Sequence, residues 1–242
     1  MRGLTGLTAR GWLVASAGLL LVVLVTAWVA GSGSGPPAPT TGSVRLGPEP
    51  GQDVAGYLAT LPATLPPPGA TAPALVQLDV PRDTAGAAAL AGQATVGTVV
   101  FRVPIDRVQT ALRFEPVTGT GEVRAALDVA RERAAFAAEA DAARAADSAA
   151  TAPPQAREAL ERRAAVTAAE RRRLADPGCA CVVALVVTAD RAGLDGLASR
   201  DGVRAVQAAA PGTRPRDLAL SPLLPEQTGT VTPPPDDGPV PG

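Results

Sequence analysis

The chain of 242 residues contains no lysine, no histidine and no asparagine, and it has only two cysteines. Histidine is the commonest general base of enzymes, the proton acceptor of Ser–His and Cys–His pairs, and a frequent zinc ligand. Lysine is needed for Schiff-base chemistry and for the phosphate-binding loop of many nucleotide hydrolases. Because both residue types are missing, the sequence predicts a protein that is not an enzyme and holds no cofactor and no metal.

Aromatic residues make up only 2% of the chain, and the net charge is only −1. One tyrosine and three phenylalanines are the only aromatic residues besides two tryptophans. Any water-soluble core must therefore consist mainly of valine, leucine and alanine. Without a net positive charge there is no overall field to attract nucleic acid, so no nucleic-acid partner is expected.

One long apolar run stands out against this composition, from Trp12 to Ala30, and it contains no charged residue. As a helix it would be about 28 Å long, close to the thickness of the hydrocarbon core of a bilayer. Tryptophan is enriched at the boundary between bilayer and water, so Trp12 and Trp28 are expected at the membrane interface. The run therefore predicts a transmembrane helix over residues 12–30, with the lipid bilayer as a partner.

Flanking charges predict the orientation of this helix. Arg2 and Arg10 precede it without any acidic residue, and the next charge after it is Arg45. Positive charge is retained on the cytoplasmic side. We therefore predict a single-pass protein of the plasma membrane with a cytoplasmic N-terminus and an extracytoplasmic C-terminal domain. The alternative is a cleaved signal peptide, for which Val25-Thr26-Ala27 is a suitable cleavage site.

Composition divides the rest of the chain into a proline- and glycine-rich linker, two stretches of strand-like alternation, a long alanine-rich stretch between them, and a proline-rich end. The alanine-rich stretch has high helix propensity and is interrupted by Pro153-Pro154, which predicts a hairpin of two helices. The predicted segments are a cytoplasmic N-terminus 1–11, a transmembrane helix 12–30, a linker with a short helix 31–73, a first βαβ half 74–117, the helical hairpin 118–177, a second βαβ half 178–224 and a disordered tail 225–242.

The two halves share one order: a strand, a short helix, a strand and an extended leucine-containing run. VQLDVPRDTAGAAALAG followed by VGTVVFRV in the first half parallels VALVVTADRAGLDGLAS followed by VRAVQA in the second. Two such units predict an α+β, ferredoxin-like sandwich, a four-stranded antiparallel sheet with two helices on one face. The helical hairpin would be an insertion between the halves.

The second half ends in a Gly-Val-x-x-Val return at residues 202–206. In this order of strand, helix and return it resembles inhibitor and propeptide domains of the subtilisin-inhibitor type. That resemblance implies a ferredoxin-like fold and, as one alternative function, inhibition of an extracytoplasmic protease. The whole chain is similar to uncharacterised single-pass membrane proteins of high-GC actinobacteria, a resemblance that implies no particular activity.

Cys179 and Cys181 lie two positions apart at the start of a predicted strand. This spacing places both side chains on one face, with the Cα atoms near the upper limit for a disulfide. Three interpretations remain open: buried thiols or a local disulfide, an intermolecular disulfide, or a redox pair. An envelope thiol–disulfide protein is therefore the first alternative function, ahead of protease inhibition.

Arginines gather in the second helix of the predicted hairpin, at Arg162-Arg163 and at Arg171–Arg173. They could bind an acidic partner or lipid headgroups. Glutamates are interleaved with them, however, which favours a solvated helix face.

The strand that follows the cysteines is apolar on both faces, which is typical of a strand buried on both sides. Since helices are expected on only one face of the sheet, the other face needs a cover, either the helical hairpin or another protein. We therefore predict a partner interface at Val183, Leu185 and Val187, with the surface of the helical hairpin as a further contact. The predicted function is non-enzymatic: mediating or regulating assembly of a cell-envelope complex, through an envelope protein or through self-association.

Overall fold

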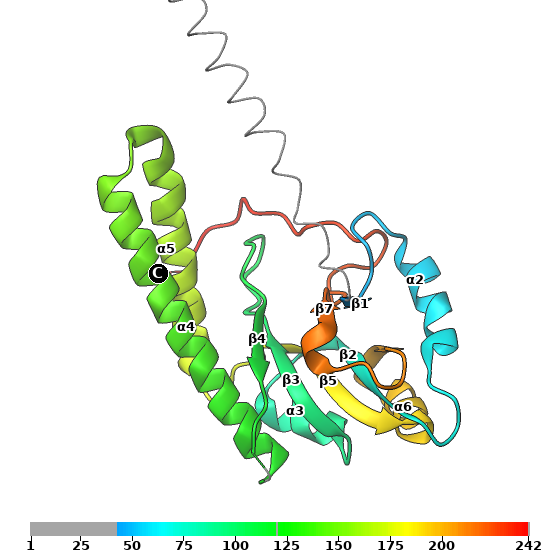
Figure 1. Ribbon diagram of the computed structural model, residues 1–242. Helices are drawn as coiled ribbons and strands as arrows, with labels where there is room; N and C mark the ends of the chain where they lie inside the picture. Colours follow the sequence, from blue (N-terminus) through cyan, green and yellow to red (C-terminus); the bar gives the residue numbers. More distant parts are fainter. Residues whose placement is uncertain (1–42, 120, 242) are drawn as a thin grey trace, which may run out of the picture. The chain divides into compact units, whose positions relative to one another are not determined.

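The computed structural model describes residues 43–119 and 121–241. The predicted membrane helix, the alternative cleavage site, and Trp12 and Trp28 lie outside these residues. The described chain has an α+β fold with a helical hairpin, as predicted (Figure 1). It contains two sheets, where the sequence predicts one. Within this part of the chain, no helix is at once long enough and apolar enough to span a bilayer.

The described residues form seven strands. Their bounds are β1 Val44–Leu46, β2 Thr71–Arg82, β3 Thr95–Phe101, β4 Arg113–Pro116, β5 Val182–Asp190, β6 Val203–Ala208 and β7 Leu218–Leu220. The larger sheet has the order β4-β3-β5-β2-β6, and every neighbouring pair in it is antiparallel. The smaller sheet pairs β1 with β7 in parallel.

Five α-helices accompany these strands in the described residues. Their bounds are α2 Val54–Thr60, α3 Thr84–Ala91, α4 Val123–Thr151, α5 Pro154–Ala175 and α6 Arg191–Ala198. The three short helices begin in the same way, after Asp53, Asp83 and Asp190, whose carboxylates each accept a hydrogen bond from a glycine N–H in the first turn. This N-cap satisfies a backbone donor that has no partner inside the helix.

The repeated units are β2–α3–β3 and β5–α6–β6, in the order that the sequence predicts. Their four strands occupy adjacent positions in the larger sheet, with β5 and β2 at the centre. The structure adds a fifth strand, β4, which pairs with β3 at the edge. This edge strand is where the hairpin attaches.

The hairpin consists of α4 and α5, which lie side by side and are joined by a short connection (Figure 1). It packs on the same face of the large sheet as α3 and α6. The buried residues that it contributes to this core are Leu127, Ala130, Ala134 and Ala138 of α4 and Leu174 of α5. Because most of these side chains are alanine, the helix backbone can approach its neighbours closely.

The opposite face of the sheet is covered by the chain itself and not by the hairpin. Leu75, Val100 and Val186 on this face pack with Leu46 of β1, and Leu220 of β7 lies partly buried against them. The prediction that the hairpin or a partner covers this face is therefore wrong, because β1 and β7 cover it. Strands of three residues carry too little alternation to be recognised in a sequence.

The prediction of a disordered tail is also corrected. Residues 225–241 pack against the domain in an ordered conformation. Val231 is buried, and its backbone exchanges hydrogen bonds with Gly51 (2.8 Å) and Gln52 (2.9 Å). The carboxylate of Glu226 accepts a hydrogen bond of 2.5 Å from Arg102, whose side chain is 7% exposed. Backbone and arginine contacts thus add to the one apolar side chain, Val231, that this segment contributes to a core cluster.

A buried polar chain holds the start of this segment to β2. Gln77 is fully buried; its amide donates to the Tyr57 hydroxyl (2.8 Å) and accepts from the backbone N–H of Leu223 (2.6 Å). The Tyr57 hydroxyl donates in turn to Gln207 (2.9 Å). Burial raises the pKa of Tyr57 above its usual value, so the hydroxyl stays protonated and able to donate.

Candidate functional site

A buried ion-pair network attaches the hairpin to the edge strand β4. Arg113, whose side chain is 8% exposed, donates to Glu170 of α5 from Nε (3.2 Å) and Nη2 (2.6 Å), and to Asp141 of α4 from Nη1 (2.9 Å). Glu170, only 1% exposed, also accepts from the backbone N–H of Ala111 (2.7 Å). One arginine thus binds both helices of the hairpin and fixes their position on the sheet.

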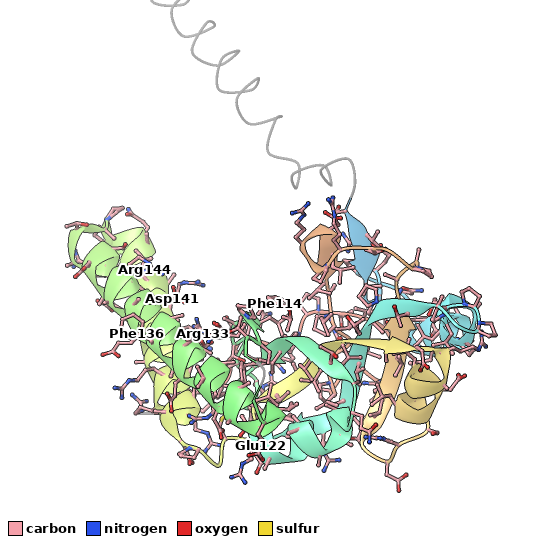
Figure 2. The ribbon with its side chains drawn as sticks, turned by 60° about the horizontal axis from the view of Figure 1, so that its bottom comes forward. Phe114, Glu122, Arg133, Phe136, Asp141 and Arg144 are labelled. Carbon is pink, nitrogen blue, oxygen red and sulfur yellow. A yellow bond between two sulfur atoms is a disulfide. The ribbon has the colours of Figure 1, made fainter. Side chains whose placement is uncertain are left out.

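A second, partly exposed ion pair between the hairpin and β4 lies one step along the strand. Arg133 of α4 is 3.3 Å from Glu115 and also donates to the carbonyl oxygen of Pro116. Arg113 and Glu115 both face the hairpin, so the alternation of the strand turns Phe114 to the other side, where it is 42% exposed (Figure 2).

A third polar contact closes the base of the hairpin. Arg131 of α4 is buried and donates from Nη1 to the carbonyl oxygen of Leu174 in the last turn of α5. Its Nε lies 4.0 Å from Asp128, which accepts a hydrogen bond of 2.5 Å from Thr84 at the start of α3. Carbonyl groups at the end of a helix have no partner within it, so this arginine satisfies one of them.

The outward face of α4 carries the most exposed large apolar side chains of the hairpin. Phe136 is 75% exposed and Val129 is 52% exposed. They lie two helical turns apart, opposite the row of residues that α4 buries. Figure 2 shows Phe136 pointing away from the rest of the chain. We call Val129 and Phe136, with the intervening Glu132 and the following Ala140 and Ala143, the outer face of α4.

The structure does not present the predicted interface residues to a partner. Val183, Leu185 and Val187 are at most 1% exposed, because β5 is the central strand of the sheet. They also do not share one face, since Leu185 and Val187 pack under the helices whereas Val183 belongs to the core on the opposite face. The prediction of an interface at these residues is therefore corrected to core packing.

A β-bulge causes this change of face. On β3, Phe101 is opposite Val182 and Val100 is opposite Ala184, so Val183 is the extra residue of β5. An extra residue in one strand shifts the alternation of side chains beyond it. Strict alternation therefore fails at Val183.

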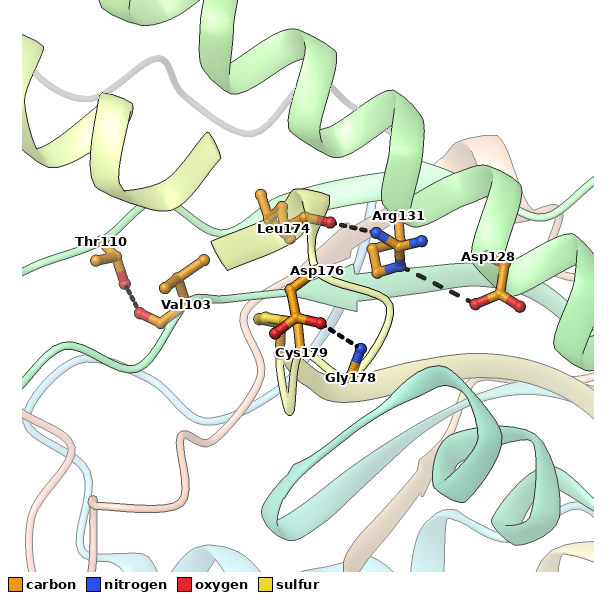
Figure 3. The surroundings of a disulfide bond; sticks show 9 residues. Val103, Thr110, Asp128, Arg131, Leu174, Asp176, Gly178 and Cys179 are labelled. Carbon is orange, nitrogen blue, oxygen red and sulfur yellow. Dashed lines mark hydrogen bonds and ion pairs between the residues drawn. A yellow bond between two sulfur atoms is a disulfide. The ribbon is translucent and has the colours of Figure 1, made fainter. Parts of the chain in front are cut away.

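The two cysteines form a local disulfide, with their Cα atoms 5.3 Å apart (Figure 3). Both residues are buried, and they close the loop between α5 and β5. Cys179 donates its backbone N–H to the Asp176 carbonyl (3.1 Å), and the Cys181 carbonyl accepts from the N–H of Arg102 (2.7 Å). The two sulfur atoms are bonded to each other, and neither cysteine lies at the surface, where it could exchange with another thiol.

Two of the clustered arginines of α5 bind the chain's own tail, which the expectation of a solvated face did not include. Arg162 donates to the carbonyl oxygens of Asp236 and Gly238 (both 3.1 Å), and Arg172 donates to that of Pro241 (2.9 Å). The acidic and carbonyl-rich partner is thus supplied by the tail. Arg171 instead lies 3.7 Å from Glu139 of α4.

Residues 43–119 and 121–241 contain no group of three or more cysteines, aspartates or glutamates placed to hold a metal ion. No family model, no curated protein and no solved structure matches the chain.

Proposed function

We propose that this chain is a membrane-anchored, extracytoplasmic protein that mediates or regulates assembly of a cell-envelope complex without catalysing a reaction. The anchor and the orientation rest on the apolar run 12–30 and its flanking arginines. The absence of lysine and histidine supports a non-enzymatic role. The observation that carries the proposal is the outer face of α4, an exposed apolar surface on a hairpin that buried ion pairs hold in place.

The domain that carries the hairpin is, in this proposal, a ferredoxin-like sandwich with a fifth edge strand. The order β3-β5-β2-β6 of the two repeated units and their antiparallel pairing support this assignment. The hairpin then corresponds to an insertion between the halves, beside the added strand β4.

The partner that fits the outer face of α4 is a helix of another envelope protein. Ala140 and Ala143 follow Phe136 on this face and leave room for a second helix to approach closely. Glu132 within this face and Glu139 beside it are both exposed. The complementary helix therefore has an apolar stripe with basic residues along its edge, and Phe136 inserts into that stripe as the central contact.

The test is co-purification of the tagged full-length protein from detergent-solubilised membranes. Phe136→Ser should lose the stoichiometric partner, because it removes the largest apolar contact without disturbing a buried residue. Phe114→Ser is the matched control, an exposed phenylalanine on β4 outside the outer face of α4, and it should retain the partner. Retention by a folded Phe136→Ser variant would contradict the proposal, and recovery of only further copies of this chain would assign the surface to self-association instead.

A further inference from the structure

We propose that the channel between residues 102–110 and α5 is a binding site for an acidic, proline-rich peptide, and that the chain's own residues 232–241 occupy it as an intramolecular ligand. This inference is independent of the function proposed above, because it concerns α5 and the loop after β3 and not the outer face of α4.

The side chains of Gln109 and Arg162 bind the tail around Asp236. The carboxylate of Asp236 accepts a hydrogen bond from the backbone N–H of Gln109 (2.9 Å) and lies 3.3 Å from Arg162 of α5. The side-chain amide of Gln109 donates to the carbonyl oxygen of Pro234 (2.6 Å). One aspartate is thus held from both walls of the channel, by the loop and by the helix.

The next two residues of the tail are held by Arg107. The Arg107 side chain is paired with the Asp237 carboxylate, and its carbonyl oxygen accepts the N–H of Gly238 (2.7 Å). Arg107 has a φ of 53° and is the only described residue other than glycine with a positive φ. An L-residue adopts this conformation rarely, and such outliers gather at sites that bind ligands.

A steric requirement at Gly238 makes the contact specific. A Cβ atom at this position would lie 2.4 Å from the carbonyl oxygen of Asp106 and 2.8 Å from the Cβ of Arg107. The first of these neighbours is backbone and cannot move aside cheaply. The channel therefore selects the sequence Asp-Asp-Gly. Its polar groups contact the two carboxylates, and the space at the third position admits no side chain.

Prolines complete the match between ligand and channel. Pro233, Pro234 and Pro235 precede the two aspartates. Proline fixes φ near the value of a polyproline II helix, so a proline-rich segment loses less conformational entropy on binding. Hollows of about 480 and 380 Å³ flank the tail, lined by Ile105 together with Pro234 or Pro241. The tail leaves these hollows unfilled, so a partner peptide with larger apolar residues there would gain contacts that the tail does not make.

The tail is held weakly enough for exchange. Arg107 and Asp237 are 53% and 63% exposed, and Arg162 and Asp236 are 34% and 46% exposed. Exposed ion pairs each change an equilibrium constant by only a few-fold. A tethered segment nevertheless competes at a local concentration of about a millimolar. A peptide that binds an empty channel with a Kd of about 100 μM should therefore bind the tail-occupied chain about tenfold more weakly.

The experiment measures binding of a fluorescent peptide, TVTPPPDDGPVPG, to the full-length protein by fluorescence anisotropy. In the variant Gly238→Ala the tail keeps every charge but no longer fits beside Asp106. The matched control is Gly229→Ala, in the same segment, where an added Cβ meets nothing within 4 Å. We expect about tenfold tighter peptide binding to Gly238→Ala than to the unaltered protein, with Gly229→Ala unchanged. Equal binding to all three proteins, or no binding to any, would overturn the proposal.

A second peptide tests whether recognition depends on the acidic residues. With Asp236→Asn and Asp237→Asn in the peptide, binding to the Gly238→Ala protein should weaken at least fivefold, and raised salt should abolish most of the difference. Equal affinity of the two peptides would overturn the assignment of an acidic ligand. Thermal melts of the three proteins serve as the control that each is folded.

Discussion

The buried pair of Arg113 and Glu170 should be decisive for docking of the hairpin, and Glu170→Ala is the direct perturbation. The substitution leaves the Arg113 guanidinium, 8% exposed, with only Asp141 as a partner, and it removes the acceptor of the Ala111 N–H. Removing one partner of a buried pair costs about 3–5 kcal/mol, because the remaining charge stays desolvated. For a domain of this size, this corresponds to a fall in Tm of roughly 6–20 °C.

The assay is thermal and urea unfolding of the full-length protein followed by circular dichroism. Arg45→Ala is the control, because Arg45 pairs with Glu49 at 3.3 Å with both side chains about half exposed or more, and it should cost less than about 1 kcal/mol. The double variant Arg113→Met, Glu170→Leu should recover much of the loss, since an apolar pair of similar volume has no charge to desolvate. A loss below about 1 kcal/mol for Glu170→Ala, or a double variant no more stable than Glu170→Ala, would contradict a stabilising role of the buried pair.

Three further predictions follow from buried or paired groups elsewhere. Tyr57→Phe should destabilise the domain by about 1–3 kcal/mol in urea unfolding, because the buried amide of Gln77 loses its hydroxyl partner. Replacing both cysteines with alanine should cost about 1–2 kcal/mol in the same assay without unfolding the domain, since the disulfide closes a very short loop; complete unfolding would contradict this. Its hydrogen bond with Arg107 lowers the pKa of Asp237 below the ordinary aspartate value, so this contact should persist from neutral pH down to about pH 4 and be lost as pH falls through the lowered pKa. The NMR shift of the Gly238 amide reports that loss, and a transition centred above pH 5 would contradict it.

Local chemistry and repetition explain what could be predicted from the sequence. The N-capping aspartates Asp83 and Asp190 stand at the same place in the two repeated units, so the helices α3 and α6 could be recognised in both. The prolines at 153 and 154 divide the alanine-rich stretch into α4 and α5 because proline is tolerated only in the first turn of a helix.

Features that depend on long-range pairing could not be predicted in this way. The bulge at Val183 arises from register with β3, and the cover of the second face arises from β1 and β7, which are far apart in the chain. The pairing of Arg113 with Glu170 likewise joins residues whose sequence neighbours do not indicate a contact.

The sequence predicts a contact through the hairpin surface, and the place of this surface on α4 could also have been anticipated. Leu127, Ala130 and Ala134 share the face that α4 buries, and Phe136 lies off that face as the only aromatic residue of the helix. An aromatic side chain opposite the buried stripe of a helix does not pack in the core that this stripe forms, so it is a candidate for a second contact surface. The tail, in contrast, has the composition of a disordered segment. Its order depends on backbone hydrogen bonds and on arginines of α5 and of the loop after β3, which its own composition does not indicate.

Partner binding at the outer face of α4 can be tested by site-specific photo-crosslinking in intact membranes, with a benzophenone amino acid in place of Phe136 in the full-length chain. We expect one crosslinked product to a different envelope protein from position 136, and no such product when the same group replaces Phe114. Absence of any product from position 136, or the same product from both positions, would contradict the proposal that the outer face of α4 binds a partner.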